Sequence, residues 1–224
     1  MAIKAVVFDL DGTLLDTETC EYEIISGIYA EHGQELPLEV WAECIGTIGG
    51  FDPYADLEAR AGRKLDREAL QILHRTRHEE GVKNISLCSG VLDRLEEARR
   101  LGLKIGLASS SRREWIEKNL ERQGIREYFE IIRSSNDVER VKPDPALYRL
   151  AVEALGVRAD EAIAIEDSRN GLRAAKAAGL WGLVVPNPVT AHLDFSEADR
   201  IVGSLEELTF EELLNDFEAK QNVD

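Results

Sequence analysis

The chain has 224 residues, of which 44% are hydrophobic, enough to bury the core of one ordinary domain together with a smaller insertion. Its 27 basic and 43 acidic residues give a formal charge of −16, which argues against binding nucleic acid or an anionic membrane through a broad basic surface. The three cysteines lack metal-ligand spacing, and we find neither a signal peptide nor an apolar run of about 18 residues, so we expect a cytoplasmic chain without a membrane span.

The first predicted strand covers residues 3–8 and runs directly into Asp9, Asp11 and Gly12. After it, residues 17–88 show helical spacing with no convincing strand between the helical segments. We therefore expect a small inserted α-helical cap domain over 17–88. The remaining residues, 1–16 and 89–224, are expected to form the catalytic core.

The rest of the chain alternates between strand and helix patterns. Apolar runs with little polar alternation, typical of strands buried on both faces of a parallel sheet, cover 103–108, 129–133, 162–165 and 181–185. Helical patterns that each end in glycine cover 91–102, 112–124, 145–156 and 168–179. This alternation predicts an α/β fold with a doubly wound parallel sheet, and an amphipathic helix from about residue 204 closes the chain.

Polar side chains collect where the predicted strands end, and ligands of open parallel sheets bind beyond these carboxyl ends. The candidates are Asp9, Asp11, Ser109, Lys142, Glu166 and Asp167. Four carboxylates this close need a cation between them, and Mg²⁺ prefers such oxygen ligands. The sequence therefore predicts a magnesium site at this edge of the sheet.

The same residues suit phosphoryl transfer. Asp9 can attack a phosphoryl group as a nucleophile, and Asp11 can protonate the leaving oxygen and later accept a proton from water. Gly12 lets the chain turn away from the substrate. Ser109 and Lys142 supply a donor and a cation for the phosphoryl oxygens, and Lys142 is expected to pair with Asp9.

Four motifs occur together and in order: DLDGTLLDTE (9–18), LASSS (107–111), VKPDP (141–145) and IEDSRNGLRAAKAAG (165–179). With them the chain resembles the haloacid dehalogenase-like hydrolase superfamily, in the subgroup that contains β-phosphoglucomutase and small sugar-phosphate phosphatases. The motifs span nearly the whole chain. The resemblance implies a Rossmann-like core, a helical cap at 17–88 and a Mg²⁺ cofactor.

The resemblance also assigns roles to residues. It implies that Asp9 is the nucleophile, and that Asp11 is the acid/base and binds Mg²⁺ through its main-chain carbonyl. The metal ligands that it implies are Asp9, Asp11, Glu166 and Asp167. The substrate and phosphate contacts that we expect are Gly12, Ser109, Ser110, Lys142 and Asn170.

Hydrolysis and mutase chemistry differ in the cap. β-Phosphoglucomutase-like sequences carry a histidine where this chain has Glu21, and an arginine in a cap loop whose counterpart here, 46–53, has no basic residue. We therefore favour a phosphatase acting on a small phosphorylated metabolite, with no obligate protein partner. A β-phosphoglucomutase-like phosphomutase is the alternative, and a non-catalytic binding or regulatory relative is favoured least. The histidines, His74 and His78 among them, are expected on the surface.

Overall fold

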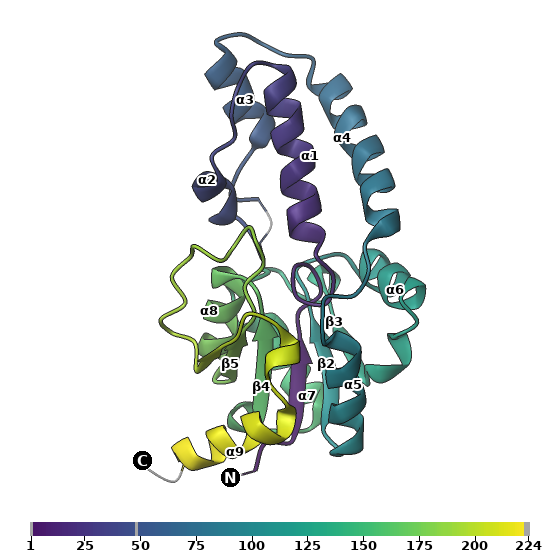
Figure 1. The fold of residues 1–224 in the computed structure, drawn as a ribbon, viewed down its shortest axis with the longest axis vertical. Coiled ribbons are helices and arrows are strands. Elements are labelled where there is room, and N and C mark those ends of the chain that lie inside the picture. The colour runs from purple at the N-terminus through teal and green to yellow at the C-terminus, as the bar shows by residue number, and fades with distance from the viewer. Residues whose placement is uncertain (1, 48, 222–224) are drawn as a thin grey trace.

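The computed structural model describes residues 2–47 and 49–221, and it shows a layered α/β unit with a group of helices at one end (Figure 1). Within the described residues the sheet has six parallel strands in the order β3-β2-β1-β4-β5-β6. The strands are β1 (Ala5–Phe8), β2 (Lys104–Ala108), β3 (Ile131–Arg133), β4 (Ala162–Glu166), β5 (Trp181–Val184) and β6 (Arg200–Ile201). The predicted doubly wound α/β fold is confirmed.

Helices cover both faces of this sheet. On one face α5 (Val91–Arg100), α6 (Arg113–Arg122) and α9 (Phe210–Gln221) pack on strand residues such as Val6 and Phe8. On the other face α7 (Ala146–Leu155) and α8 (Arg169–Ala178) pack on a set that includes Ala5 and Val7. Alternate residues of one strand therefore enter different cores, which explains why the strands read as continuous apolar runs.

Two details of this layer differ from the sequence prediction. The strand β6 was missed, because its two residues are exposed and join the sheet edge beside Leu183 and Val184 through backbone pairing alone. The closing helix α9 begins at Phe210 rather than near 204, because a short 3-10 turn occupies Leu205–Glu207 first. The other 3-10 turns lie at Val82–Asn84, Arg126–Tyr128, Ser135–Asp137 and Ala159–Glu161.

The helical region, residues 17–84, stands above the sheet in Figure 1. Its α-helices are α1 (Thr17–Glu31), α2 (Leu38–Ala42), α3 (Pro53–Ala61) and α4 (Arg67–Gly81). They share a hydrophobic cluster in which Ile25, Tyr29 and Leu57 are buried together with Val189 from the loop after β5. Asp16 caps α1 by accepting a hydrogen bond from the Thr19 backbone N–H at 3.1 Å, so the helix starts directly after the loop that follows β1.

The chain leaves and re-enters the sheet layer at one place. Leu15 and Leu87 form an antiparallel bridge, and the Cys88 backbone N–H donates to the Leu14 carbonyl at 2.9 Å. The two connections between the sheet and the helical region are thus held side by side by backbone hydrogen bonds.

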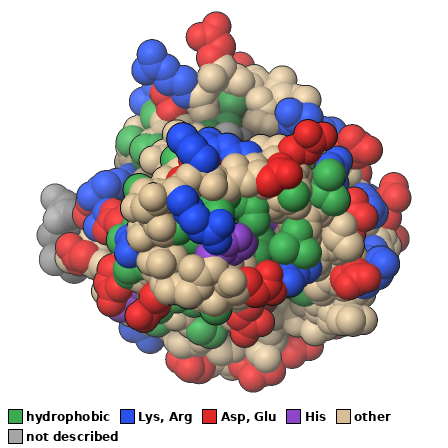
Figure 2. Space-filling view, turned by 90° about the horizontal axis from the view of Figure 1, so that it is seen from above, with side chains coloured by type: hydrophobic (Ala, Val, Ile, Leu, Met, Phe, Trp, Pro, Cys, Tyr) green, Lys and Arg blue, Asp and Glu red, His purple; other side chains and the backbone are tan. Residues whose placement is uncertain are grey.

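The surface shows mixed charge. Acidic and basic side chains are interspersed over the face seen from above in Figure 2, which fits the expectation that no broad basic surface is present there. Among the described residues, none of the helices combines the length and the apolar character that a bilayer crossing requires.

Candidate active site

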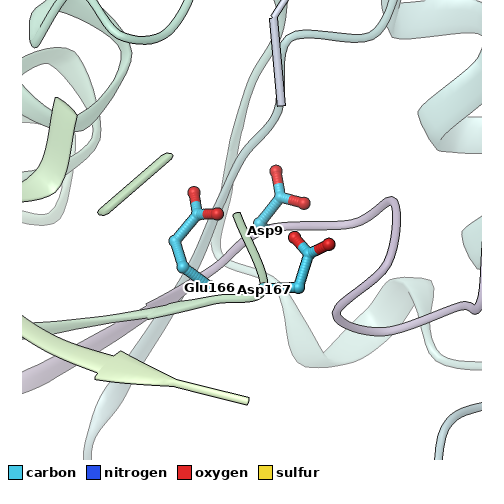
Figure 3. A group of neighbouring side chains, drawn as sticks. All are labelled: Asp9, Glu166 and Asp167. Atoms are coloured by element: carbon cyan, nitrogen blue, oxygen red, sulfur yellow. The ribbon is translucent and has the colours of Figure 1, made fainter. Parts of the chain in front are cut away.

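Three carboxylates meet where β1 and β4 end. The two strands pair in parallel with Phe8 beside Ile165, so Asp9, which follows β1, comes next to Glu166 and Asp167. One oxygen from each carboxylate lies within 4.8 Å of the others, all three side chains are buried, and they converge in Figure 3. Parallel pairing thus brings together acids that are far apart in the sequence.

Lys142 is the cation of this cluster. It is only 1% exposed, and its Nζ donates to Asp9 Oδ1 at 2.5 Å and to Glu166 Oε1 at 2.6 Å. Burial alone would lower the pKa of Lys142, but the two carboxylates outweigh burial and raise it, so the ammonium stays charged. The Tyr148 hydroxyl donates to the same Glu166 oxygen at 2.5 Å.

The charges of the cluster do not balance, because three carboxylates face one ammonium. Burial and the neighbouring carboxylates raise the pKa of Asp9 and of Asp167, although Lys142 opposes both shifts. A divalent cation would offset this excess of negative charge, and the available donors are the hard oxygen ligands that such cations prefer. The cluster therefore fits a divalent cation held by Asp9, Glu166 and Asp167.

The side chain of Asp11 stands apart from this cluster and is held by three donors. Its Oδ1 accepts from Thr17 Oγ1 at 3.0 Å and from Trp115 Nε1 at 2.9 Å, and its Oδ2 accepts from Ser111 Oγ at 2.6 Å. These contacts fix the carboxyl group in one orientation, as proton transfer to a bound substrate requires. A role for its main-chain carbonyl at the metal stays a prediction.

Two glycines allow this crowding. Gly12 has a φ of +84°, and a Cβ there would lie 2.1 Å from Asp167 Oδ2. A Cβ on Gly171 would lie 1.9 Å from Glu166 Oε2. Any larger residue at either position would displace a carboxylate of the cluster. Gly12 was singled out from the sequence, whereas Gly171 was not.

A cavity of about 340 Å³ opens over Asp9 between the sheet edge and the helical region. Its lining residues from the sheet side are Asp9, Asp11, Ser109, Ser110, Ser111, Arg112 and Trp115. Residues from α1, the loop after α2, and α4 complete the wall. The structure thus brings the predicted residues Asp9, Asp11, Ser109 and Ser110 to one cavity, while Lys142 is buried beside Asp9.

Asn170 does not line this cavity. Its Nδ2 donates to the backbone carbonyls of Glu43 at 3.1 Å and Ile45 at 2.8 Å, because the first turn of α8 points toward the loop after α2. Ser110 also contacts this loop, through a 2.9 Å hydrogen bond to the Gly46 carbonyl. Both side chains therefore connect the sheet layer to the helical region.

Several residues of the site were missed from the sequence. Trp115 fits the apolar spacing of its helix and reads as a core residue, yet its indole N–H reaches Asp11. Asn187, in a loop after β5, donates to Asp167 at 2.7 Å and carries no motif signal. His78 was expected on the surface; its ring is partly exposed, lines the cavity and lies 5.3 Å from the Trp115 ring.

Comparison with known proteins finds similar sequences and structures that agree with one another in family. Residues 6–185 match the family model described as haloacid dehalogenase-like hydrolase. The chain is 46% identical over 213 residues to "Putative phosphatase YhcW" of Bacillus subtilis, covering 95% of this chain and 97% of that protein. It is 30% identical over 189 residues to the phosphorylated carbohydrates phosphatase of Thermotoga maritima, covering 80% of this chain and 82% of that protein. The crystal structure of CbbY from Rhodobacter sphaeroides in complex with phosphate is similar at a TM-score of 0.72 and 33% identity, covering 92% of this chain and 96% of that chain.

Proposed function

This chain belongs to the haloacid dehalogenase-like hydrolase family and is a phosphatase, and from that premise we propose that it is a Mg²⁺-dependent phosphomonoesterase working through an aspartyl-phosphate at Asp9. The observation that carries the proposal is the position of Asp9. Its carboxylate is paired with the buried Lys142, adjoins two further carboxylates, and lines the same cavity as Asp11.

In the first half of the proposed reaction an oxygen of Asp9 attacks the phosphorus of the ester. The bond between phosphorus and the ester oxygen breaks, and Asp11 gives its proton to the departing alcohol. Lys142 and Ser109 hold the phosphoryl oxygens, whose charge spreads in the transition state. The contacts of Asp11 with Thr17 and Trp115 support this role, because they position its carboxyl group.

In the second half water attacks the phosphorus of the aspartyl-phosphate. Asp11, now ionised, takes a proton from that water, the bond between phosphorus and the Asp9 oxygen breaks, and inorganic phosphate leaves. Both aspartates return to their starting states.

Asp9, Glu166 and Asp167 are the side chains that would hold Mg²⁺. The ion supplies positive charge that offsets repulsion between the carboxylates and the phosphoryl group. Lys142, which donates to Asp9 and Glu166, would contribute a second positive charge to the same cluster.

We also propose that residues 17–88 form a cap domain over a core of 1–16 and 89–224. The hydrophobic cluster of α1–α4, which is distinct from the clusters on the two sheet faces although Val189 joins it, and the adjacent crossings at Leu15 and Leu87 support this division.

Hydrolysis of a sugar phosphate or a similar small ester is favoured over mutase chemistry. A mutase must hold a phosphate group at both ends of a bisphosphate, whereas the helical region gives the cavity wall the acids Glu18 and Glu21. The relative named for phosphorylated carbohydrates supports the same substrate class.

The test is release of inorganic phosphate from sugar phosphates, phosphoglycolate, glycerol phosphate and nucleotides, in Mg²⁺ and in EDTA. We expect release that depends on Mg²⁺ and that falls by at least about 1,000-fold in Asp9→Asn, because the amide is not a nucleophile. Asp93→Asn, at an exposed position on α5, is the matched control and should behave as wild type. Near-normal turnover by Asp9→Asn would refute the covalent mechanism, and interconversion of glucose phosphates without phosphate release would favour the mutase.

A further inference from the structure

The loop after β5 brings Asn187 to the carboxylate cluster at the sheet edge. Asn187 is buried, at 8% exposure, and its Nδ2 donates to Asp167 Oδ2 at 2.7 Å. The proposed reaction assigns no role to this contact. A buried amide that contacts a carboxylate of the cluster can still act on the cation through that carboxylate.

The side-chain amide of Asn187 is held in one orientation. Its Oδ1 accepts from the backbone N–H groups of Val189 at 3.0 Å and Thr190 at 3.1 Å. The amide nitrogen carries only donors, so it could not take the place of Oδ1 in these two hydrogen bonds. The NH₂ group is therefore the end of the amide that faces Asp167.

Further hydrogen bonds hold the loop where it carries Asn187. The hydroxyl of the buried Thr190 accepts from the Asn187 backbone N–H at 3.1 Å. The backbone N–H groups of Thr190 and Ala191 donate to the Asn187 carbonyl at 3.1 and 3.0 Å. Asparagine suits such a turn, because its side chain bonds to the backbone two residues further on. The turn thus places the donor before any cation binds.

Asp167 is held differently from the other two carboxylates of the cluster. Lys142, which pairs with both of those, makes no hydrogen bond to Asp167 in the part of the chain that the structure describes. The Thr13 hydroxyl lies 3.4 Å from Asp167 Oδ1, a long distance for a hydrogen bond between two oxygens. The short hydrogen bond that orients the Asp167 carboxylate is therefore the one from Asn187.

Gly12 leaves the space that this pair of side chains occupies. A Cβ on Gly12 would lie 2.1 Å from Asp167 Oδ2 and 2.8 Å from Asn187 Nδ2. The absence of a side chain at this position thus serves the amide as well as the carboxylate.

An amide also suits the charge of the cluster. A lysine or arginine beside Asp167 would offset its negative charge and weaken the attraction of the cluster for a divalent cation. A carboxylate beside it would repel it. Asn187 instead donates a hydrogen bond without adding charge, and it leaves the charge of Asp167 to the cation.

We propose that Asn187 is a positioning residue of the cation site, and that it holds the Asp167 carboxylate in the orientation that binds Mg²⁺. The inference rests on the proposed function, of which Mg²⁺ dependence is a part. Hydrogen-bond partners of metal-binding side chains typically change metal affinity by about 10- to 100-fold. The affinity for Mg²⁺, rather than the chemical step, should therefore depend on Asn187.

The experiment measures the Kd of Mg²⁺ by isothermal titration calorimetry on the full chain, after treatment with EDTA and dialysis. Asn187→Ala removes the donor to Asp167 and the acceptor of the turn. Asn187→Ser also removes that donor but keeps an oxygen that can accept from the N–H groups of the turn. We expect both variants to raise the Kd by the same factor, at least about tenfold. The Mg²⁺ concentration for half-maximal phosphate release should rise in parallel, while kcat at saturating Mg²⁺ stays close to that of wild type.

Asn136→Ser is the matched control and should keep the wild-type Kd. Asn136 is exposed, and its Oδ1 accepts from the Arg113 backbone N–H at 2.9 Å rather than contacting the cluster. Circular dichroism in EDTA shows whether each variant is folded, and Asn187→Ser decides the question if Asn187→Ala fails to fold.

The outcomes separate the inference from the proposed function. An unchanged Kd in Asn187→Ser would assign the role of Asn187 to the turn alone and overturn the inference, while the proposed function would stand. Failure of wild type to bind Mg²⁺ would overturn the proposed Mg²⁺ dependence and the inference with it.

Discussion

The sheet edge and the helical region satisfy their polar groups differently. At the sheet edge the buried carboxylates of Asp9, Glu166 and Asp167 all accept hydrogen bonds from protein donors. In the helical region the buried Glu21 Oε2 and Trp41 Nε1 have no partner. The groups proposed for the chemistry are therefore held by protein partners before a substrate arrives, whereas these buried polar atoms of the helical region have none.

The strongest test of this contrast removes the cation of the sheet edge. Lys142→Met leaves two buried carboxylates without their ammonium, so we expect a loss of about 3–5 kcal/mol in the free energy of unfolding. We also expect kcat to fall by about 100- to 1,000-fold, because the negative charge on the phosphoryl oxygens loses the ammonium proposed to stabilise it. Urea denaturation in EDTA and phosphate release measure the two effects.

Lys4→Met is the matched control for that variant. Lys4 is largely exposed and pairs with Glu161 at 2.7 Å, and such surface pairs contribute about 0–1 kcal/mol. Similar losses of stability in the two variants would contradict the view that the sheet edge is assembled around Lys142.

A smaller effect is expected where the two regions meet. Trp115 donates to Asp11 while its ring lies beside His78 of α4. Trp115→Phe keeps the ring contact and removes the N–H, so kcat should fall about tenfold with little change in KM. Trp181→Phe is the control, because its N–H donates to the Asp160 carbonyl outside the cavity and its loss should leave kcat unchanged. A change in KM alone would place Trp115 in substrate binding instead.

The smallest effect concerns only the helical region. Hydrogen bonds from Arg67 and from the Leu65 backbone N–H lower the pKa of Glu58 from 4.5 to about 2. Because the folded pKa lies below the unfolded value, the stabilisation is present above about pH 5 and is lost as the pH falls toward 2. Melting temperatures of wild type and Glu58→Gln should therefore converge as the pH is lowered from 7 to about 3. A constant difference between them would contradict this assignment.

Much of the fold follows from local patterns. Runs of apolar residues predict β1, β2, β4 and β5, because a strand covered on both faces has no polar side to interrupt the run. The same logic places Asp9 and Asp167 together, since parallel strands end at one edge. β6 could not be found this way, because two exposed residues paired only through the backbone leave no pattern in the sequence.

The rest of the site depends on long-range packing. Trp115 lies 104 residues from Asp11 in the chain, and its apolar spacing predicts only burial. The orientation of the Asn170 side chain depends on hydrogen bonds to the backbone carbonyls of Glu43 and Ile45, in a loop more than a hundred residues earlier in the chain. His78 reaches the cavity because α4 packs beside α1, which the helical pattern of either segment does not specify.

The bridge between Leu15 and Leu87 brings the two ends of the helical region to neighbouring points of the sheet layer. The helical region therefore connects to the sheet as a single long loop would, and its length does not change the path of any strand. A different insertion between the same two positions would leave the carboxylates of Asp9, Glu166 and Asp167 in place. If the proposed function holds, the sheet edge could therefore keep one reaction while changes in the insertion alter which molecule undergoes it.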